Sequence, residues 1–126
     1  MTLRQLMAVT AVVTLVFGLA LVTDPAQVVS WYGAGLGPAG LFIARLYGAL
    51  LIVVGVIAWA GRDAGPSEAR QAILLGFFLG DAIGFVIALW GQLQAVVNSL
   101  GWSIVILYFL FAIGFGYFRF ARSFAK

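Results

Sequence analysis

The sequence predicts an all-α integral membrane protein, a four-transmembrane-helix bundle with a short interfacial helix between spans one and two. Of its 126 residues, 64% are hydrophobic and 9% are charged, and the mean hydropathy is +1.14. A soluble domain carries about 25% charged residues, so this composition does not supply a water-facing surface. A helical span needs about 20 apolar residues. Four such runs, separated by turn signals, fill residues 1–126 as a single membrane domain.

The residue counts also exclude several chemistries. The chain has no cysteine and no histidine, which rules out a thiolate nucleophile, a Ser-His pair, His-ligated haem and the usual zinc sites. The four acidic residues offer no pair with metal-ligand spacing within one predicted helix. We therefore expect no cofactor, no metal site and no enzymatic activity.

The first predicted span covers residues 6–22 and is closed by Thr23-Asp24-Pro25, because proline does not continue a helix. A signal peptide is the alternative interpretation. Its charged region would hold only Arg4, and the best small-residue cleavage pattern, Gly18-Leu19-Ala20, lies inside the apolar run. We therefore expect a span.

A short interfacial helix is predicted at residues 25–32. Asp24 is a candidate N-cap, Pro25 fits the first helical position, and Gly33 is a candidate C-cap. Valines and aromatic residues gather on one side, which is typical of a helix lying in the membrane interface. The segment is either a connector that seals the outer end of the bundle or a lid over a cavity.

The remaining spans are predicted at residues 39–60, 69–90 and 100–118. Gly37-Pro38 begins the second, and Pro66-Ser67-Glu68 precedes the third, with Glu68 favoured in the first turn by the helix dipole. The third ends at Gly91-Gln92, and the fourth stops at a basic tail.

The basic residues predict the orientation, because lysine and arginine in short loops are retained on the cytoplasmic side. Six of the seven fall on one side of the predicted topology, namely Arg4, Arg62, Arg70, Arg119, Arg122 and Lys126. We expect a bacterial inner-membrane protein with both termini cytoplasmic and no nucleic-acid partner. Aromatic residues at the span ends are interface anchors in this layout: Trp31, Trp90 and Trp102 outside, Trp59 and Tyr117 inside.

A stripe of small residues recurs at every fourth position of span three, comprising Ala72, Gly76, Gly80, Gly84 and Ala88. Small residues let helices approach closely in lipid, where no hydrophobic force drives helices together. We expect this stripe to pack span three within the bundle. The alternative is contact with a second copy or another membrane protein.

Two ionisable residues fall inside spans, where a charge is costly and favours a functional hypothesis. Arg45 lies ~10 Å and Asp81 ~15 Å from the outer ends of their spans, at ~1.5 Å per residue. Three interpretations stand: a structural Arg45–Asp81 pair, a polar site for an ion, proton or head group that also includes Tyr47, or unrelated roles. In the last, Arg45 reaches the outer interface and Asp81 stays neutral among phenylalanines. The hydroxyls at membrane depth, including Thr10, Thr14, Ser103 and Tyr108, are expected to stabilise their own helices.

The chain resembles small four-span bacterial inner-membrane proteins of the DoxX-like kind. The likeness is carried by Asp24-Pro25 after span one, by Trp31-Tyr32-Gly33, by Ala44-Arg45-Leu46-Tyr47-Gly48-Ala49 in span two, and by the glycine-rich third span. The resemblance implies the four-span fold and, for some members, association with redox complexes. Small multidrug transporters and fluoride channels fit less well, since span one lacks an acidic residue and the expected Gly-Thr-Leu-x-x-Asn motif is missing.

Two functions follow. The first is a non-catalytic subunit or assembly factor of a membrane complex, because no extramembrane domain and no catalytic group are predicted. The second is a small transporter or channel that uses Asp81 and Arg45.

Overall fold

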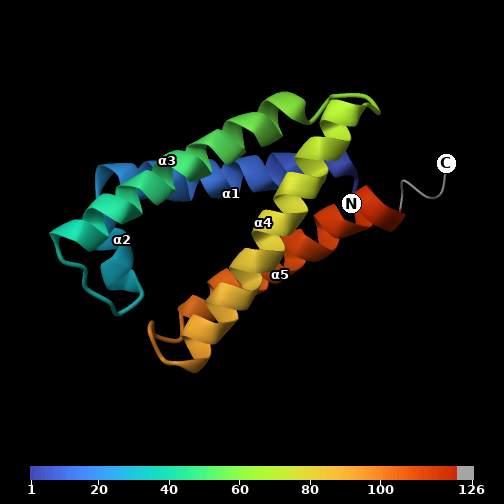
Figure 1. The fold of residues 1–126 in the computed structure, drawn as a ribbon. Helices are drawn as coiled ribbons and strands as arrows, with labels where there is room; N and C mark the ends of the chain where they lie inside the picture. Colours follow the sequence, from blue (N-terminus) through green and yellow to red (C-terminus); the bar gives the residue numbers. More distant parts are fainter. Residues whose placement is uncertain (122–126) are drawn as a thin grey trace. The chain divides into compact units, whose positions relative to one another are not determined.

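The computed structural model describes residues 1–121, and this part of the chain is helical as predicted (Figure 1). Four of its helices are long and apolar enough to cross a membrane, α5 and η1 together counting as one. This is the architecture of a multi-pass membrane protein. The elements are α1 (Leu3–Thr23), α2 (Pro25–Trp31), α3 (Pro38–Gly61), α4 (Glu68–Leu93), α5 (Gly101–Gly116) and the π-helical turn η1 (Tyr117–Ala121). Arg122 and Lys126 of the predicted basic tail lie outside the described residues.

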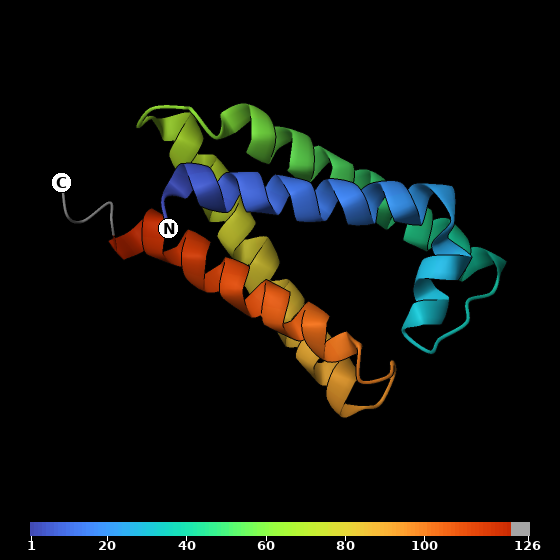
Figure 2. The ribbon, with the colours of Figure 1, turned by 180° about the vertical axis from the view of Figure 1, so that it is seen from behind.

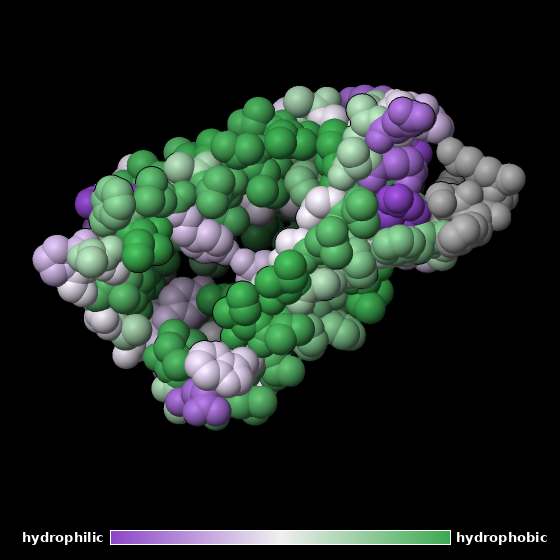
Figure 3. Space-filling model, viewed as in Figure 1, coloured by the Kyte–Doolittle hydropathy of each residue, from purple (hydrophilic) through white to green (hydrophobic). Residues whose placement is uncertain are grey.

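The chain divides into two compact units, Met1–Asp63 and Ala64–Lys126, which are described separately. Large apolar side chains remain exposed along the long helices of both units. Figure 3 shows apolar residues over most of the visible helix surface, while hydrophilic residues gather where α3 ends and α4 begins. Exposed apolar helix surfaces of this kind are suited to contact with lipid tails and are poorly suited to contact with water.

Unit 1 is an antiparallel hairpin of α1 and α3, which lie side by side in Figures 1 and 2. Its close contact is made by glycines. A Cβ added to Gly18 would lie 2.8 Å from the carbonyl oxygen of Gly48, and one added to Gly48 would lie 2.8 Å from that of Gly18. A Cβ on Gly55 would meet the Thr14 hydroxyl at 2.8 Å. Only glycine fits at such a backbone contact.

The short α2 confirms the predicted interfacial segment. The Asp24 carboxylate accepts a hydrogen bond from the backbone N–H of Gln27 at 3.3 Å, and Pro25 occupies the first turn. Gly33 has a φ of 74°, and the next N–H, of Ala34, bonds to the Val29 carbonyl. This is a Schellman ending, in which a left-handed residue after the helix is best supplied by glycine.

Unit 2 is an antiparallel hairpin of α4 and α5 whose interface is mainly aromatic. Three edge-on or tilted ring pairs join α4 to α5 and η1, with centroids 5.1–5.4 Å apart. Such pairs add about 0.5–1.5 kcal/mol each beyond the area they bury. The pairs are Phe77–Phe115, Phe78–Phe120 and Phe85–Phe109.

Two predicted boundaries in unit 2 were wrong. The third span does not end at Gly91-Gln92, because α4 continues to Leu93 and closes in a second Schellman ending with Ala95 at a φ of 56°. A glycine is tolerated inside a helix that packing supports, so Gly91 did not mark its end. The fourth span does not stop at Phe118, since the π-helical turn carries it to Ala121.

Candidate functional site

Arg45 of α3 donates a hydrogen bond to the C-terminal end of α1. Its Nε donates a hydrogen bond to the backbone carbonyl of Val22, 3.3 Å away, in the last turn of that helix. The last four carbonyls of a helix lack partners in it, and its C-terminus carries a partial negative charge, so a guanidinium fits there. The side chain is exposed and keeps four further N–H donors on its terminal nitrogens. The interpretation in which Arg45 reaches the outer interface stays a prediction.

Tyr47 does not share the face of Arg45. Residues two positions apart on a helix point to different sides. Arg45 lies on the side of α3 that carries Gly48 and faces α1, whereas Tyr47 is exposed beside it. The structure therefore does not gather these two side chains into one site within unit 1.

Asp81 lies at the midpoint of α4, on the side that packs against α5. It follows Phe77 by four residues and precedes Phe85 by four, and both of these rings contact rings of α5. The side chain is half-buried. Within the described residues of unit 2, it has neither a hydrogen bond nor an ion pair.

The predicted Arg45–Asp81 pair joins residues of different units. Each side chain is described in its own unit only, Arg45 bonded to Val22 and Asp81 without a partner. The pair therefore stays a prediction, and a double-mutant cycle decides it.

The small-residue stripe of α4 is only partly used by α5. Gly84 packs against the Tyr108 ring, where an added Cβ would lie 2.6 Å from a ring carbon. Among the described residues of unit 2, a Cβ on Gly76 or Gly80 would meet no atom within 4 Å. Ala72 is exposed and Ala88 is half-buried. Within unit 2, the predicted packing role holds for Gly84, and the contact made by Gly76 and Gly80 stays a prediction.

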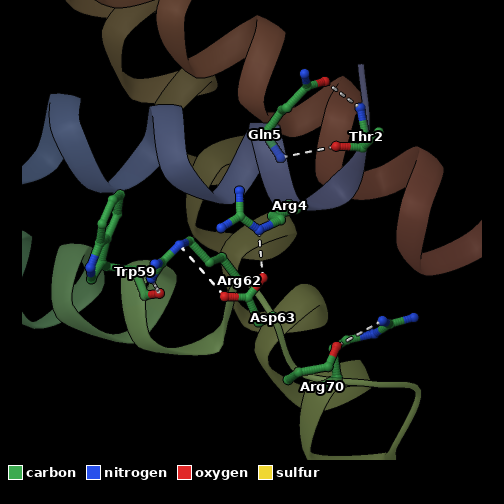
Figure 4. A network of polar contacts seen from close by, with 8 residues as sticks. Thr2, Arg4, Gln5, Trp59, Arg62, Asp63 and Arg70 are labelled. Atoms are coloured by element: carbon green, nitrogen blue, oxygen red, sulfur yellow. Dashed lines mark hydrogen bonds and ion pairs between the residues drawn. The ribbon is translucent and has the colours of Figure 1, made fainter.

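A polar cluster closes the open end of unit 1 (Figure 4). Arg4 Nε lies 2.5 Å from the Asp63 carboxylate, which Arg62 approaches at 3.8 Å from its other side. The hydrogen bond from Arg4 lowers the pKa of Asp63, and the charges of Arg4 and Arg62 act in the same direction. Arg62 also stacks on the Trp59 ring, with its central carbon 3.7 Å from the ring centroid.

Sequence reasoning missed this cluster, although a signal was present. Arg4 precedes span one and Asp63 follows span two, so an antiparallel pair of spans brings opposite charges to the same end. A salt bridge across that end is then expected.

Asp24 and Glu68, two further acidic residues, each lie at the start of a helix. Asp24 caps α2, and Glu68 stands in the first turn of α4, where the helix dipole favours a negative charge. No group of three or more acidic residues able to hold a metal ion occurs among residues 1–121.

The predicted bond to the hydroxyl's own helix is present for Thr14 and Ser103 and absent for Thr10 within the described residues. Thr14 donates to the Thr10 carbonyl at 2.7 Å, and Ser103 donates to the Leu100 carbonyl at 2.6 Å. The Thr10 hydroxyl is buried without a hydrogen-bond partner in the described residues, so the expected bond to its own helix was wrong there. Thr14, one turn further along the same face of α1, donates a hydrogen bond from its hydroxyl to the Thr10 carbonyl.

All four tryptophans are exposed near helix ends, which is compatible with interface anchors. The exposed fractions range from 43% to 64%. Trp90 and Trp102 lie at the same end of the α4–α5 hairpin, and Trp31 and Trp59 lie toward opposite ends of unit 1. Their contact with the membrane interface stays a prediction.

No family model, no curated protein and no solved structure matches the chain. The class defined by the fold is a multi-pass helical membrane protein, and the resemblance to DoxX-like proteins stays a prediction.

Proposed function

We propose that the protein is a non-catalytic accessory or assembly subunit of a complex in the bacterial inner membrane. The observation that carries this proposal is the face of α4 that α5 leaves uncovered. Gly76 and Gly80 lie there, exposed, and among the described residues of unit 2 no atom comes within 4 Å of where a Cβ would stand. In lipid, such a face suits close approach by another helix.

The uncovered face is separate from the internal interface of unit 2. The α4–α5 hairpin is held by phenylalanine pairs and by the Tyr108 ring over Gly84. It does not use the small size of Gly76 and Gly80. Two glycines inside one helix cost about 1 kcal/mol each relative to alanine, so we expect a packing partner that offsets this cost.

The acidic residues support a non-catalytic role. Asp24 and Asp63 each accept a hydrogen bond that orders a helix end or the hairpin, and Glu68 lies in a first turn. These positions explain three of the four acidic residues without any chemistry on a substrate. Asp81 is the one acidic residue whose presence these positions do not explain.

The arrangement within each unit supports an orientation with both termini cytoplasmic. Arg4 and Arg62 lie at one end of the α1–α3 hairpin. In unit 2, Arg70 begins α4 and Arg119 ends the antiparallel α5–η1 segment, so both lie at the same end of that hairpin. The short link from Gly61 to Glu68 joins these two ends, and basic ends are retained in the cytoplasm.

A small transporter or channel is the second candidate. It is favoured by Asp81 at mid-membrane depth without a partner in its unit and by the four unused donors of Arg45. In this function, the two side chains form an intramembrane polar site for an ion or a charged ligand.

One experiment separates the two candidates. The tagged protein is purified in a mild detergent, and the proteins that co-migrate with it are identified by mass spectrometry. A second membrane protein in stoichiometric amount supports the accessory role. A lone oligomer whose proteoliposomes pass ions or drugs in an Asp81-dependent manner overturns it.

A further inference from the structure

We propose that Asp81 is a proton-binding site within the membrane, independent of the Arg45 side chain. This inference goes beyond the accessory role and does not rest on it. The bound species is one proton, held covalently on a carboxylate oxygen, so that the side chain is a neutral carboxylic acid at neutral pH.

The position of Asp81 limits what can stabilise a charge there. It lies on the α5-facing side of α4, between Phe77 and Phe85, whose rings pack against Phe115 and Phe109. Gly84, one turn away, is covered by the Tyr108 ring. Asp81 therefore lies, half-buried, on the aromatic face of α4 near the middle of a span.

No cation faces Asp81 from the elements packed against α4 in its unit. The segment Gly101–Gly116 of α5 holds no charged residue, and Tyr108 is its one titratable group. In η1, Arg119 lies beside the Phe120 ring, 5.2 Å from its centroid, and Tyr117 is exposed. On α4 itself, Glu68 and Arg70 are at its far end, Arg70 ~16 Å along the helix at ~1.5 Å per residue.

Arg45 has a hydrogen-bond partner within its own unit. Its Nε bonds to the Val22 carbonyl at the end of α1, and its Cβ points toward the N-terminus of α3. An ionised carboxylate that has neither an ion pair nor a hydrogen bond is costly in an apolar setting. Uptake of a proton removes the charge and leaves one O–H donor that is far less costly to bury.

Infrared spectroscopy of the protein in lipid nanodiscs tests the proposal directly. The wild-type spectrum minus that of Asp81→Asn should show the carbonyl stretch of a protonated carboxylic acid at neutral pH. The same band should remain in Arg45→Gln. A carboxylate band in its place, converted to the protonated form by Arg45→Gln, would show an ion pair and overturn the proposal.

Modification by dicyclohexylcarbodiimide gives a second readout that needs only the wild-type protein. The carboxyl oxygen adds to the carbodiimide carbon, and the acid proton passes to one of its nitrogens. The resulting O-acylisourea rearranges to an N-acylurea with no loss of atoms. Peptide mapping should place the adduct on Asp81, with the yield falling as the pH is raised.

The matched control for this labelling is Glu68→Gln, on the same helix but at its exposed end. The adduct should be lost in Asp81→Asn and unchanged in Glu68→Gln. An adduct on Glu68 with none on Asp81 would contradict a protonated carboxyl at mid-membrane depth.

Discussion

Gly18 of α1 and Gly48 of α3 face each other so closely that each backbone carbonyl occupies the space of a side chain on the other. A Cβ on either residue would lie 2.8 Å from the facing carbonyl oxygen. This contact brings the backbones of α1 and α3 close together in unit 1. Together with the Arg4–Asp63 and Arg45–Val22 contacts, it holds α1 and α3 in a fixed register.

Gly48→Ala is expected to destabilise unit 1. The added methyl forces backbone atoms apart, and overpacking of this kind costs about 1–3 kcal/mol. The matched control is Gly76→Ala, where an added Cβ meets no atom within 4 Å. There we expect no loss and a gain of up to ~1 kcal/mol from helix propensity. Reversible unfolding in mixed detergent micelles measures both, and equal effects of the two variants would contradict the close contact.

Ala95→Gly is expected to stabilise unit 2. Ala95 has a φ of 56° at the position after α4 where glycine is preferred. The left-handed conformation costs an L-residue about 1–2 kcal/mol, so the gain is about 1 kcal/mol. Gly33→Ala, at the equivalent position after α2 with a φ of 74°, should lose a similar amount. Thermal unfolding of both variants checks the signs, and a loss in Ala95→Gly would refute this backbone assignment.

The stability of unit 1 should fall in acid because of Asp63. Its pKa is lowered in the folded protein, first by the hydrogen bond from Arg4. A group with a depressed folded pKa stabilises the protein above its unfolded value, here the ordinary 3.8. That stabilisation is lost as the pH falls through the lower folded value. The unfolding midpoint of the wild type should therefore decrease below pH 3.8, and Asp63→Asn should flatten this part of the profile.

Added salt and substitution of Arg4, the partner of Asp63, provide the controls for the pH dependence of the unfolding midpoint. Both side chains of the pair are more than half exposed, so added salt should weaken their contribution. Arg4→Gln should reduce the acid-dependent part as Asp63→Asn does. A profile that neither substitution alters would assign the acid sensitivity to another carboxyl group.

Substitutions at Arg45 and Asp81 are expected to act independently. Arg45→Ala removes the bond to the Val22 carbonyl, and a hydrogen bond to a charged group contributes about 1.5–3 kcal/mol, less at an exposed site. Asp81→Ala removes a carboxylic acid, which is neutral under the proposal above, from the face of α4 that packs against α5. Losses in the double variant should add within about 0.5 kcal/mol. A double variant no worse than either single one would instead establish the Arg45–Asp81 pair.

Much of the fold could be predicted because it depends on local signals. Composition and apolar runs located the four long helices, and Asp24, Pro25 and Gly33 located α2. The end of α4 could not be predicted from Gly91, since tertiary packing overrides the weak helix propensity of a single glycine. The sequence also did not show which glycines lie at close contacts between helices. Gly18 stands alone in span one, and only the partner helix reveals its role.

The candidate site was less predictable than the fold. Depth arguments identified Arg45 and Asp81 as unusual, but the Arg45–Val22 bond depends on where α1 ends relative to α3. A sequence pattern likewise does not show which members of a small-residue stripe meet a neighbour. Gly84 faces Tyr108, whereas Gly76 and Gly80 do not face α5, because an aromatic interface sets the rotation of α4 in its hairpin.

The recovery of a co-purified membrane protein from the Gly76→Leu/Gly80→Leu double variant tests the central claim most directly. The matched control is Ala49→Leu, which enlarges an exposed small residue of α3. A stoichiometric partner should be recovered with the wild type and with Ala49→Leu and should be lost from the double variant. Full recovery from a double variant that unfolds as cooperatively as the wild type would contradict the claim.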